Sequence, residues 1–450
     1  MSTSVLSRAL PLRSLCRATA TVSRTTTPIL SHAQLTSTRR ISSSSATRFA
    51  SIDTTSDLHS TSSIPVPPTP RTTQTAAEQH ATGQIRYDWT KEEIKRIYHS
   101  PLMDLLFHAA KVHRLYHDPL AVQQCTLLSI KTGGCQEDCA YCPQSSKHKT
   151  AVKATKLLPE DEVLVAARAA KEAGSSRFCM GAAWRDLNGR KSNFKDILNY
   201  VKEIRGMGME VCCTLGMLSP EQARQLKEAG LTAYNHNLDS SREYYPKLWR
   251  VEVENGAIEC GIEESQLMKR QIITTRSYDE RLQTIANVRE AGISVCSGGI
   301  IGLGEQHEDR VGLLHTLATL PEHPESVPVN ALLAVQGTPL EGSKPVEIWE
   351  MIRMIATARI IMPGSMIRLS AGRVKFSQPE QSLCFMAGAN SIFTGDKLLT
   401  TPNNAYNDDQ AMFDTLGLTP KVANFRQGSD KFLPEVEVVK PSGGGLVIEG

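Results

Sequence analysis

The stretch Cys125-Thr-Leu-Leu-Ser-Ile-Lys-Thr-Gly-Gly-Cys135-Gln-Glu-Asp-Cys139-Ala-Tyr-Cys142-Pro143 combines the start of a fold with an unusual chemical loop. Residues 125–130 are mostly aliphatic or β-branched, a pattern typical of a short buried strand. A loop with three cysteines follows this strand directly. A buried strand that ends in a reactive loop is how a repeating strand–helix unit of an α/β protein begins.

The alternation of strand and helix continues along the chain. Seven further strands are predicted, at 177–180, 210–214, 233–238, 294–298, 326–331, 366–370 and 391–393. Helical patterns separate them, at 161–173, 219–229, 278–291 and 346–361 among others. Eight such units predict an α/β fold whose parallel sheet closes into a (β/α)8 TIM-type barrel. An open doubly wound sheet is the alternative, but the glycines of 298–304 do not follow its G-x-G-x-x-G pattern.

Composition excludes two classes of protein. The 450 residues include 50 Lys and Arg against 47 Asp and Glu, a net charge of +3. Such a near-balance argues against a nucleic-acid binder driven by charge. No apolar run approaches the ~18 residues of a membrane-spanning helix, so no membrane association is expected.

The charge is unevenly distributed. Residues 1–52 contain seven arginines and no acidic residue, and they are rich in serine. This composition is typical of a mitochondrial transit peptide, so we expect the mature protein in the matrix. Subtracting the leader's +7 from the chain's +3 leaves −4 for residues 53–450.

Three further segments complete the predicted organisation. Residues 53–86 are polar and proline-rich, which predicts a disordered linker. The barrel domain is then expected at 87–420, and a flexible tail at 421–450.

The three cysteines of the opening stretch have the spacing C-x3-C-x2-C. Cys135, Cys139 and Cys142 can converge on one inorganic group, and thiolates suit zinc or an iron–sulfur cluster. A closed zinc site needs a fourth ligand, and His148 stands at an unsuitable spacing. Three thiolates therefore favour a [4Fe–4S] cluster with one open iron.

This motif, with Tyr141 before its last cysteine, resembles that of the radical S-adenosylmethionine (SAM) superfamily. Other blocks between about Tyr87 and Leu418 narrow the resemblance to the biotin synthases. They include Arg177-Phe-Cys-Met-Gly-Ala-Ala-Trp184, Tyr234-Asn-His-Asn-Leu-Asp239, Ser326-Val-Pro-Val-Asn330 and Arg368-Leu-Ser-Ala-Gly-Arg373. The resemblance implies a radical SAM barrel in which the open iron of the cluster binds SAM.

A second set of cysteines is spread over the predicted strands. Cys179, Cys212 and Cys296 lie in different strands, and Arg368 lies in a fourth. A buried cysteine is usually a small hydrophobic residue, but an arginine inside a barrel needs negative charge nearby. The resemblance implies that these four residues hold a [2Fe–2S] cluster. Cys213 should face outward, and Cys125 and Cys384 are expected to be core or helix-face residues.

Polar residues gather at the ends of two predicted strands. Asn235, Asn237 and Asp239 follow one strand with period two, and Asn330 ends another. An amide offers a donor and an acceptor, which matches a cyclic urea, although such residues also cap loops. The resemblance implies that Asn237, Asn330 and Asn235 bind dethiobiotin. Asn237, Asp239, Tyr141, Gly298, Gly299 and Gly302 would bind SAM.

The implied activity is that of a sulfurtransferase, which inserts sulfur between C6 and C9 of dethiobiotin to form biotin. Its unactivated C–H bonds require radical chemistry from the cofactor. The resemblance also implies an external electron donor, iron–sulfur assembly proteins and a homodimer. Two alternatives remain: a lipoyl synthase-like enzyme, disfavoured by the lack of another clustered cysteine motif before Cys135, and a non-catalytic iron–sulfur or zinc carrier.

The chain departs from the resemblance at 246–271. This segment adds on the order of 25 residues without a clear period. It follows the strand that leads to Asp239, so it is expected at the mouth of the site, as an atypical surface loop or a retained intron. Cys260 within it is not expected to be a ligand.

Overall fold

The structure is a computed structural model that describes residues 73–245 and 272–426. The predicted transit peptide at 1–52, the insertion at 246–271 and most of the predicted tail lie outside the described residues. The first part of the predicted linker, 53–72, lies outside them as well.

Eight parallel strands form the barrel. They are β1 (Ala121–Lys131), β2 (Arg177–Ala182), β3 (Glu210–Thr214), β4 (Ala233–Asn235), β5 (Ser294–Cys296), β7 (Ser326–Ala331), β8 (Met366–Leu369) and β9 (Ser391–Thr394). Each pairs with the next, and β9 pairs with β1, which closes the sheet. Two short strands lie off this ring: β6 (Gly299–Ile301) pairs with β7, and β10 (Thr419–Pro420) with β1. The closed (β/α)8 barrel is therefore confirmed, and the open sheet is excluded.

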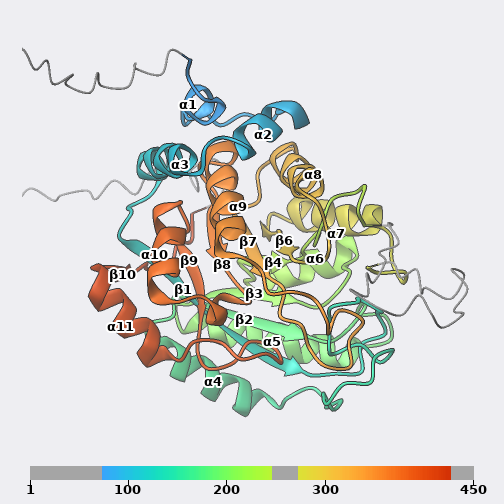
Figure 1. The fold of residues 1–450 in the computed structure, drawn as a ribbon. Coiled ribbons are helices and arrows are strands. Elements are labelled where there is room, and N and C mark those ends of the chain that lie inside the picture. The colour runs from blue at the N-terminus through green and yellow to red at the C-terminus, as the bar shows by residue number, and fades with distance from the viewer. Residues whose placement is uncertain (1–72, 246–271, 427–450) are drawn as a thin grey trace, which may run out of the picture. The chain divides into compact units, whose positions relative to one another are not determined.

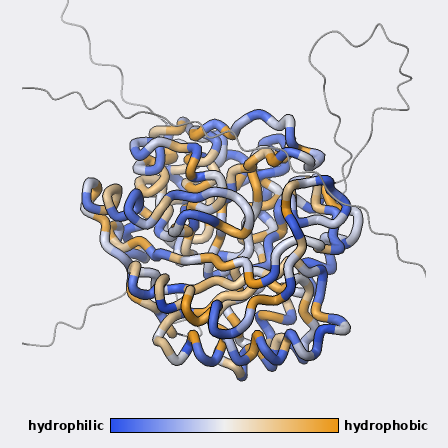
Figure 2. Tube along the Cα trace, turned by 90° about the horizontal axis from the view of Figure 1, so that it is seen from below, coloured by the Kyte–Doolittle hydropathy of each residue, from blue (hydrophilic) through white to orange (hydrophobic). Residues whose placement is uncertain are grey.

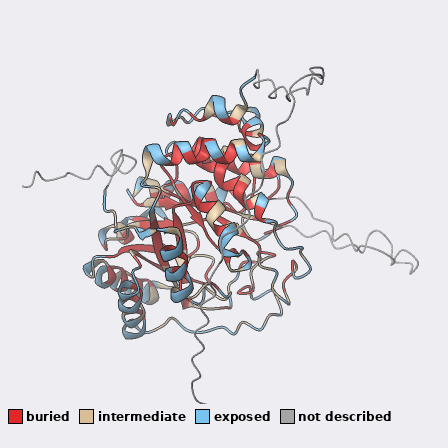
Figure 3. Ribbon diagram, turned by 60° about the vertical axis from the view of Figure 1, so that its left-hand side comes forward, coloured by how far each residue is buried: buried red, intermediate tan, exposed pale blue. Residues whose placement is uncertain are grey.

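One long helix follows each barrel strand and covers it from outside (Figure 1). These helices are α4 (Glu160–Glu172), α5 (Lys191–Gly206), α6 (Pro220–Glu228), α7 (Tyr278–Glu290), α8 (His307–Ala318), α9 (Ile348–Ile361), α10 (Gln378–Met386) and α11 (Tyr406–Leu416). A 3-10 turn, η3 (Arg373–Lys375), precedes α10. The strands are buried almost throughout, whereas the outer helices expose one side (Figure 3).

Local sequence explains where the helices begin and end. Ser219 caps α6 by accepting a hydrogen bond from the Gln222 backbone N–H at 3.2 Å, and Pro220 is the first helical residue. Gly230, just past that helix, has φ +97°, a conformation that costs glycine nothing. In the view of Figure 2 the outer helices alternate between hydrophilic and hydrophobic residues, as amphipathic helices do.

Two of the predicted strands are shorter than expected. The strand predicted at 233–238 ends at Asn235, and the one predicted at 294–298 ends at Cys296. Asp239 adopts φ +67°, outside strand geometry, and its backbone carbonyl accepts a hydrogen bond from the Ile300 N–H at 2.9 Å. Residues 236–239 are irregular, but they still run beside 296–299: the His236 N–H donates to the Cys296 carbonyl at 2.9 Å, and Asp239 forms an isolated parallel bridge with Gly299.

The ordered fold begins earlier than the sequence indicated. Residues 73–86 were predicted as linker, but they contain helix α1 (Ala76–His80), which packs with α2 (Lys91–Tyr98) and α3 (Leu102–Tyr116) beside α9. Ala77 is fully buried, and its backbone N–H donates to Ser100 Oγ at 3.1 Å. Two small apolar residues, Ala77 and Ala81, were enough to anchor a segment whose composition is otherwise polar.

The beginning of the predicted tail is also part of the fold. The Lys421 backbone N–H donates to the Val122 carbonyl, and the Asn424 N–H donates to Glu210 Oε1 at 2.7 Å. Phe425 lies against the Arg205 guanidinium, 3.6 Å from ring centroid to Cζ. Residues 421–426 thus cover the end of the barrel at which the strands begin. Among the described helices, none is long and apolar enough to span a membrane.

A buried histidine in α3 predicts sensitivity to acid. Burial lowers the pKa of His113 to about 2, helped by the Arg359 guanidinium of α9, and its Nε2 has no hydrogen-bond partner. Below about pH 6.5 the His113 imidazole binds a proton in the unfolded chain but stays neutral in the folded chain. The contribution of His113 to stability is therefore complete above about pH 6.5 and falls below it, by about 2 kcal/mol at pH 5.

Urea unfolding at pH 7.5 and pH 5 checks this expectation. His113→Met, which keeps the volume and removes the titrating group, should shrink the difference between the two pH values by about 2 kcal/mol. His307→Gln, at a half-exposed imidazole, should leave the difference unchanged. An equal pH dependence of the unsubstituted chain and His113→Met would refute the assignment.

Candidate active site

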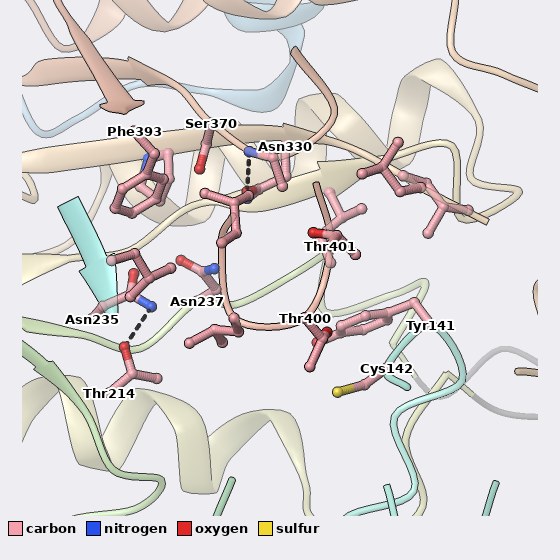
Figure 4. Close-up of a pocket in the computed structure, with 18 of the residues that line it drawn as sticks. Tyr141, Cys142, Thr214, Asn235, Asn237, Asn330, Ser370, Phe393, Thr400 and Thr401 are labelled. Carbon is pink, nitrogen blue, oxygen red and sulfur yellow. Dashed lines mark hydrogen bonds between the residues drawn. The ribbon is translucent and has the colours of Figure 1, made fainter. Parts of the chain in front are cut away.

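The carboxyl ends of the barrel strands surround a cavity of about 240 Å³. Its floor includes Cys179, Cys212 and Arg368, and its wall includes Asn235, Asn237, Asp239 and Asn330. Tyr141 and Cys142 line one side, and Thr400 and Thr401 cover it from the loop after β9 (Figure 4). This is the position of the active site in TIM barrels.

The loop after β1 gathers the first three cysteines. The Cys142 backbone N–H donates to the Cys139 carbonyl at 2.9 Å, and the Cys135 carbonyl accepts from the Ser146 N–H at 2.8 Å. Burial raises the pKa of Cys139 to about 11 and that of Cys142 to about 12. These thiols therefore hold their protons until a metal displaces them.

The loop fits a cluster better than a single ion. Within residues 73–245 and 272–426, no three acidic, histidine or cysteine side chains are close enough to share one metal ion. In a [4Fe–4S] cluster each thiolate binds a different iron. His148 is not aimed at the thiols, since its Nε2 contacts the Cys139 carbonyl oxygen at 2.9 Å.

Asp239 links this loop to the cavity wall. Its Oδ2 accepts a hydrogen bond from the Tyr141 hydroxyl at 2.6 Å and lies 2.6 Å from Arg281 Nη2. Both side chains of the ion pair are 3% exposed, and the Asp239 carboxylate raises the pKa of Arg281 against the effect of burial. The pair fixes the carboxylate beside Cys142 in the same cavity.

Sequence reasoning missed Arg281, although a signal was present. Tyr278, Arg281, Ile285 and Val288 recur at intervals of three and four residues, and all four are buried on one face of α7. An arginine on an otherwise apolar helix face needs a carboxylate. Thr400, Thr401 and the rest of the loop after β9 were missed as well, since this loop shows no periodicity.

The asparagines face the cavity, but each already has a backbone or side-chain partner. Asn235 Nδ2 donates to Thr214 Oγ1 at 3.2 Å, and Asn237 Oδ1 accepts from the Gly298 N–H at 3.2 Å. Asn330 donates to the Gly299 carbonyl at 2.9 Å and accepts from the Ala371 N–H at 3.2 Å. An amide has two donor hydrogens and two lone pairs, so each asparagine keeps capacity for a ligand. His236, between them, is buried and absent from the cavity lining.

The barrel interior brings the second set of cysteines together. Cys179 and Cys212 are direct neighbours on β2 and β3. Cys296, which does not line the cavity, has its Sγ 3.6 Å from Arg368 Nη1. Arg368 is 1% exposed, and of the described residues no carboxylate forms an ion pair with it. The buried guanidinium has thiols rather than carboxylates around it. A cluster held by these thiols would supply the negative charge that the guanidinium needs.

Cys213 and Cys384 lie away from this set, as expected. Cys213 packs in the layer between the strands and the helices, and Cys384 is buried on α10. Cys125 is buried as well, but it lies inside the barrel among Cys179, Cys212 and Ala233.

A polar layer, at the end of the barrel where the strands begin, closes the barrel beneath these thiols. Gln123 Nε2 donates to Glu210 at 3.2 Å, and Arg177 Nε donates to Glu210 Oε2 at 2.7 Å. Arg368 Nη2 lies 3.5 Å from Gln123 Oε1. This polar layer, formed by Gln123, Glu210 and Arg177, is nearly inaccessible to solvent, and residues 421–426 lie below it.

Gly298, Gly299 and Gly302 do not line the cavity. Each is closely approached by the protein itself. A Cβ on Gly298 would stand 2.0 Å from the Pro328 carbonyl oxygen, one on Gly299 2.2 Å from Leu313 Cδ2, and one on Gly302 2.6 Å from Val346 Cγ2. Close packing at the end of the barrel therefore explains why glycine is needed at these three positions.

Gly298→Ala is expected to destabilise the barrel. The added Cβ meets the backbone of β7, which can move only by disturbing its pairing, so we expect a loss of about 2 kcal/mol in unfolding free energy. Gly206→Ala, at the end of α5 where a Cβ meets nothing within 4 Å, should be neutral or stabilising. Chemical denaturation measures both, and equal midpoints for the two variants would contradict the packing argument.

Comparison with known proteins connects this geometry to a family. Residues 129–317 match the radical SAM superfamily, and residues 328–419 match the biotin and thiamin synthesis associated domain. The chain is 67% identical over 351 residues to the mitochondrial biotin synthase of Arabidopsis thaliana, covering 78% of this chain and 86% of the relative. The chain belongs to the biotin synthase family.

Other biotin synthases extend the similarity. That of Cytophaga hutchinsonii is 59% identical over 77% of this chain and 95% of its own. The mitochondrial biotin synthase of Emericella nidulans is 52% identical over 80% and 86%. Among solved structures, methylornithine synthase has a TM-score of 0.58 at 17% identity, covering 77% of this chain and 97% of its own. The [FeFe]-hydrogenase maturase HydG has 0.62 at 16%, covering 78% and 75%. These two show the fold that the biotin synthase family shares with them.

Proposed function

We propose that this chain inserts sulfur into dethiobiotin at C6 and C9 to form biotin, as a radical SAM sulfurtransferase. One observation carries the proposal. A single cavity has Cys142, Tyr141 and Asp239 on one side and Cys179, Cys212 and Arg368 on its floor. A substrate held there stands between a source of radicals and a source of sulfur.

The two metal groups divide the cysteines between them. Cys135, Cys139 and Cys142 hold a [4Fe–4S] cluster, and Cys179, Cys212, Cys296 and Arg368 hold a [2Fe–2S] cluster. When bound, these clusters and SAM supply a carbon-centred radical and a sulfur atom. The orphaned Nη1 of buried Arg177, next to the second set, supports a negative group at this place.

The protein's own part is positioning. Asp239, fixed by Arg281 and Tyr141, accepts the hydroxyls of the SAM ribose, and Asn237 contacts both SAM and substrate. Asn235 and Asn330 offer their free amide capacity to the ureido ring of dethiobiotin. Gly298, Gly299 and Gly302 do not line the cavity, so their part toward the methionine end of SAM is limited to the backbone path that their close packing allows.

The remaining wall suits the aliphatic part of the substrate. Leu127, Ile300 and Leu332 line the cavity, together with Leu398 and Leu399 of the loop after β9. Their side chains exclude water from the reacting carbons. The hydroxyls of Thr400 and Thr401 are available in the same loop to a carboxylate (Figure 4).

Anaerobic reconstitution tests the proposal. The full chain is loaded with iron and sulfide, both are quantified, and it is incubated with dethiobiotin, SAM and a reductant. We expect biotin and 5′-deoxyadenosine. Absence of both products from a protein that carries its clusters would overturn the enzyme assignment, and 5′-deoxyadenosine without biotin would overturn the substrate.

The setting of the enzyme is also a proposal. The arginine-rich, acid-free residues 1–52 and the two mitochondrial relatives support import into the mitochondrial matrix. There an external electron donor and iron–sulfur assembly proteins serve the enzyme, which is a homodimer. Protein terminal sequencing of the imported chain and light scattering test the leader and the dimer.

A further inference from the structure

The barrel interior holds four thiols rather than the three assigned to the second cluster. Cys125 on β1 is fully buried and packs directly against Cys179, Cys212 and Ala233. Leu127 and Phe393 cover this group from either side. The residue expected to be ordinary core thus lies within the proposed ligand set.

Arg368 connects Cys125 to that set. Its Nη2 donates to Cys125 Sγ at 3.4 Å, its Nη1 to Cys296 Sγ at 3.6 Å and its Nε to Ser391 Oγ at 3.0 Å. The guanidinium therefore lies between two sulfurs on opposite sides of the barrel. Shortening this side chain would leave space directly beside the Cys125 sulfur.

Positive charge surrounds Cys125, although burial raises the pKa of its thiol. Two guanidinium groups, of Arg177 and Arg368, are buried in this layer, and Glu210 pairs with Arg177. Nη1 of Arg177 has no hydrogen-bond partner, although the side chain is only 8% exposed. The positive charge of this layer is not balanced by carboxylates of the described residues, so the layer can accommodate the negative charge of a cluster ligated by sulfur.

We propose that Cys125 is a reserve ligand that can replace Arg368 as the fourth ligand of the [2Fe–2S] cluster. The inference rests on the proposed function, because it takes that cluster as given. In a chain without the arginine, a bond from iron to the Cys125 sulfur takes the place of the bond to nitrogen. The thiol releases its proton to solvent as it binds, as the other three do.

Iron content of reconstituted full-length variants tests the proposal. The unsubstituted chain should hold about six irons, four in the first cluster and two in the second. Arg368→Ala should also hold about six, and in its Mössbauer spectrum the two irons of the second cluster should show ligation by sulfur alone. Arg368→Ala with Cys125→Ser should fall to about four, and the retained first cluster reports that this variant is folded.

Two controls isolate the position of the thiol. Cys125→Ser alone should keep about six irons, because Arg368 remains. Arg368→Ala with Cys384→Ser, which removes a buried thiol on α10, should match Arg368→Ala.

Three results would decide against the proposal. Equal iron in Arg368→Ala and its Cys125→Ser double variant refutes the role of Cys125, and so does loss of about two irons from Arg368→Ala alone. An unsubstituted chain with only about four irons overturns the second cluster itself, and the reserve ligand with it.

Discussion

Cys139→Ala is expected to abolish SAM cleavage, lowering 5′-deoxyadenosine formation at least about a thousandfold, or about 4 kcal/mol of activation free energy. Cys139 is the most deeply buried thiol of the first cluster loop. Two neighbours in that loop also fix its carbonyl. Two thiolates cannot keep three irons in place, so the cluster is lost and the radical is never generated.

Deoxyadenosine is quantified in reconstituted protein with SAM and reductant, beside the iron content. Cys213→Ala is the matched control, since it removes an equally buried thiol that packs between the strands and the helices. It should cost about 1 kcal/mol of stability and leave both readouts unchanged. Sustained deoxyadenosine formation by Cys139→Ala would refute the role of the first cluster loop.

Asp239→Asn should cost both stability and SAM binding. The substitution keeps the shape of the side chain but leaves the buried guanidinium of Arg281 without its carboxylate. A second guanidinium, that of Arg276, already has Glu137 as its partner at 3.6 Å. Breaking a buried pair in this way destabilises by about 3 kcal/mol. Asparagine also keeps only one uncharged acceptor oxygen, so if Asp239 accepts both ribose hydroxyls as proposed, SAM binding should weaken about a hundredfold.

Thermal unfolding without SAM and equilibrium dialysis with labelled SAM separate the two effects. Asp279→Asn makes the same change at an exposed pair, in which Asp279 lies 2.7 Å from Arg242. It should leave the midpoint and the SAM affinity unchanged. If Asp239→Asn behaves like this control in both measurements, Asp239 holds neither Arg281 nor SAM.

Much of the barrel could be predicted because local patterns and barrel geometry agree. Cys179 and Cys212 were expected to meet, and the register pairs them directly. The eight repeats required closure, which the pairing of β1 with β9 provides. Asn235, Asn237 and Asp239 were expected on one side by strand alternation. They do share the cavity, but beyond Asn235 an irregular segment that bridges to Gly299 brings them there rather than a regular strand.

The parts that escaped prediction depend on contacts between distant segments. Leu399 packs so closely on Gly181 that a Cβ there would stand 2.4 Å from Leu399 Cδ2. The sequence of residues 398–401 has no pattern that predicts this contact. The role of this loop in covering the cavity was therefore missed. The helix at Ala76–His80 and the docking of residues 421–426 were missed for the same reason, since composition alone marked both segments as linker or tail.

The polar layer that closes one end of the barrel has a consequence for how substrate and product reach the site. Among the described residues, Gln123, Glu210 and Arg177 fill one end of the barrel and residues 421–426 lie beneath them. The cavity at the carboxyl ends of the strands is therefore the route to the barrel interior. Dethiobiotin enters through it and biotin leaves through it. If the second cluster donates its sulfur as proposed, the replacement atom must use the same opening, so renewal of that cluster has to wait until the product has left.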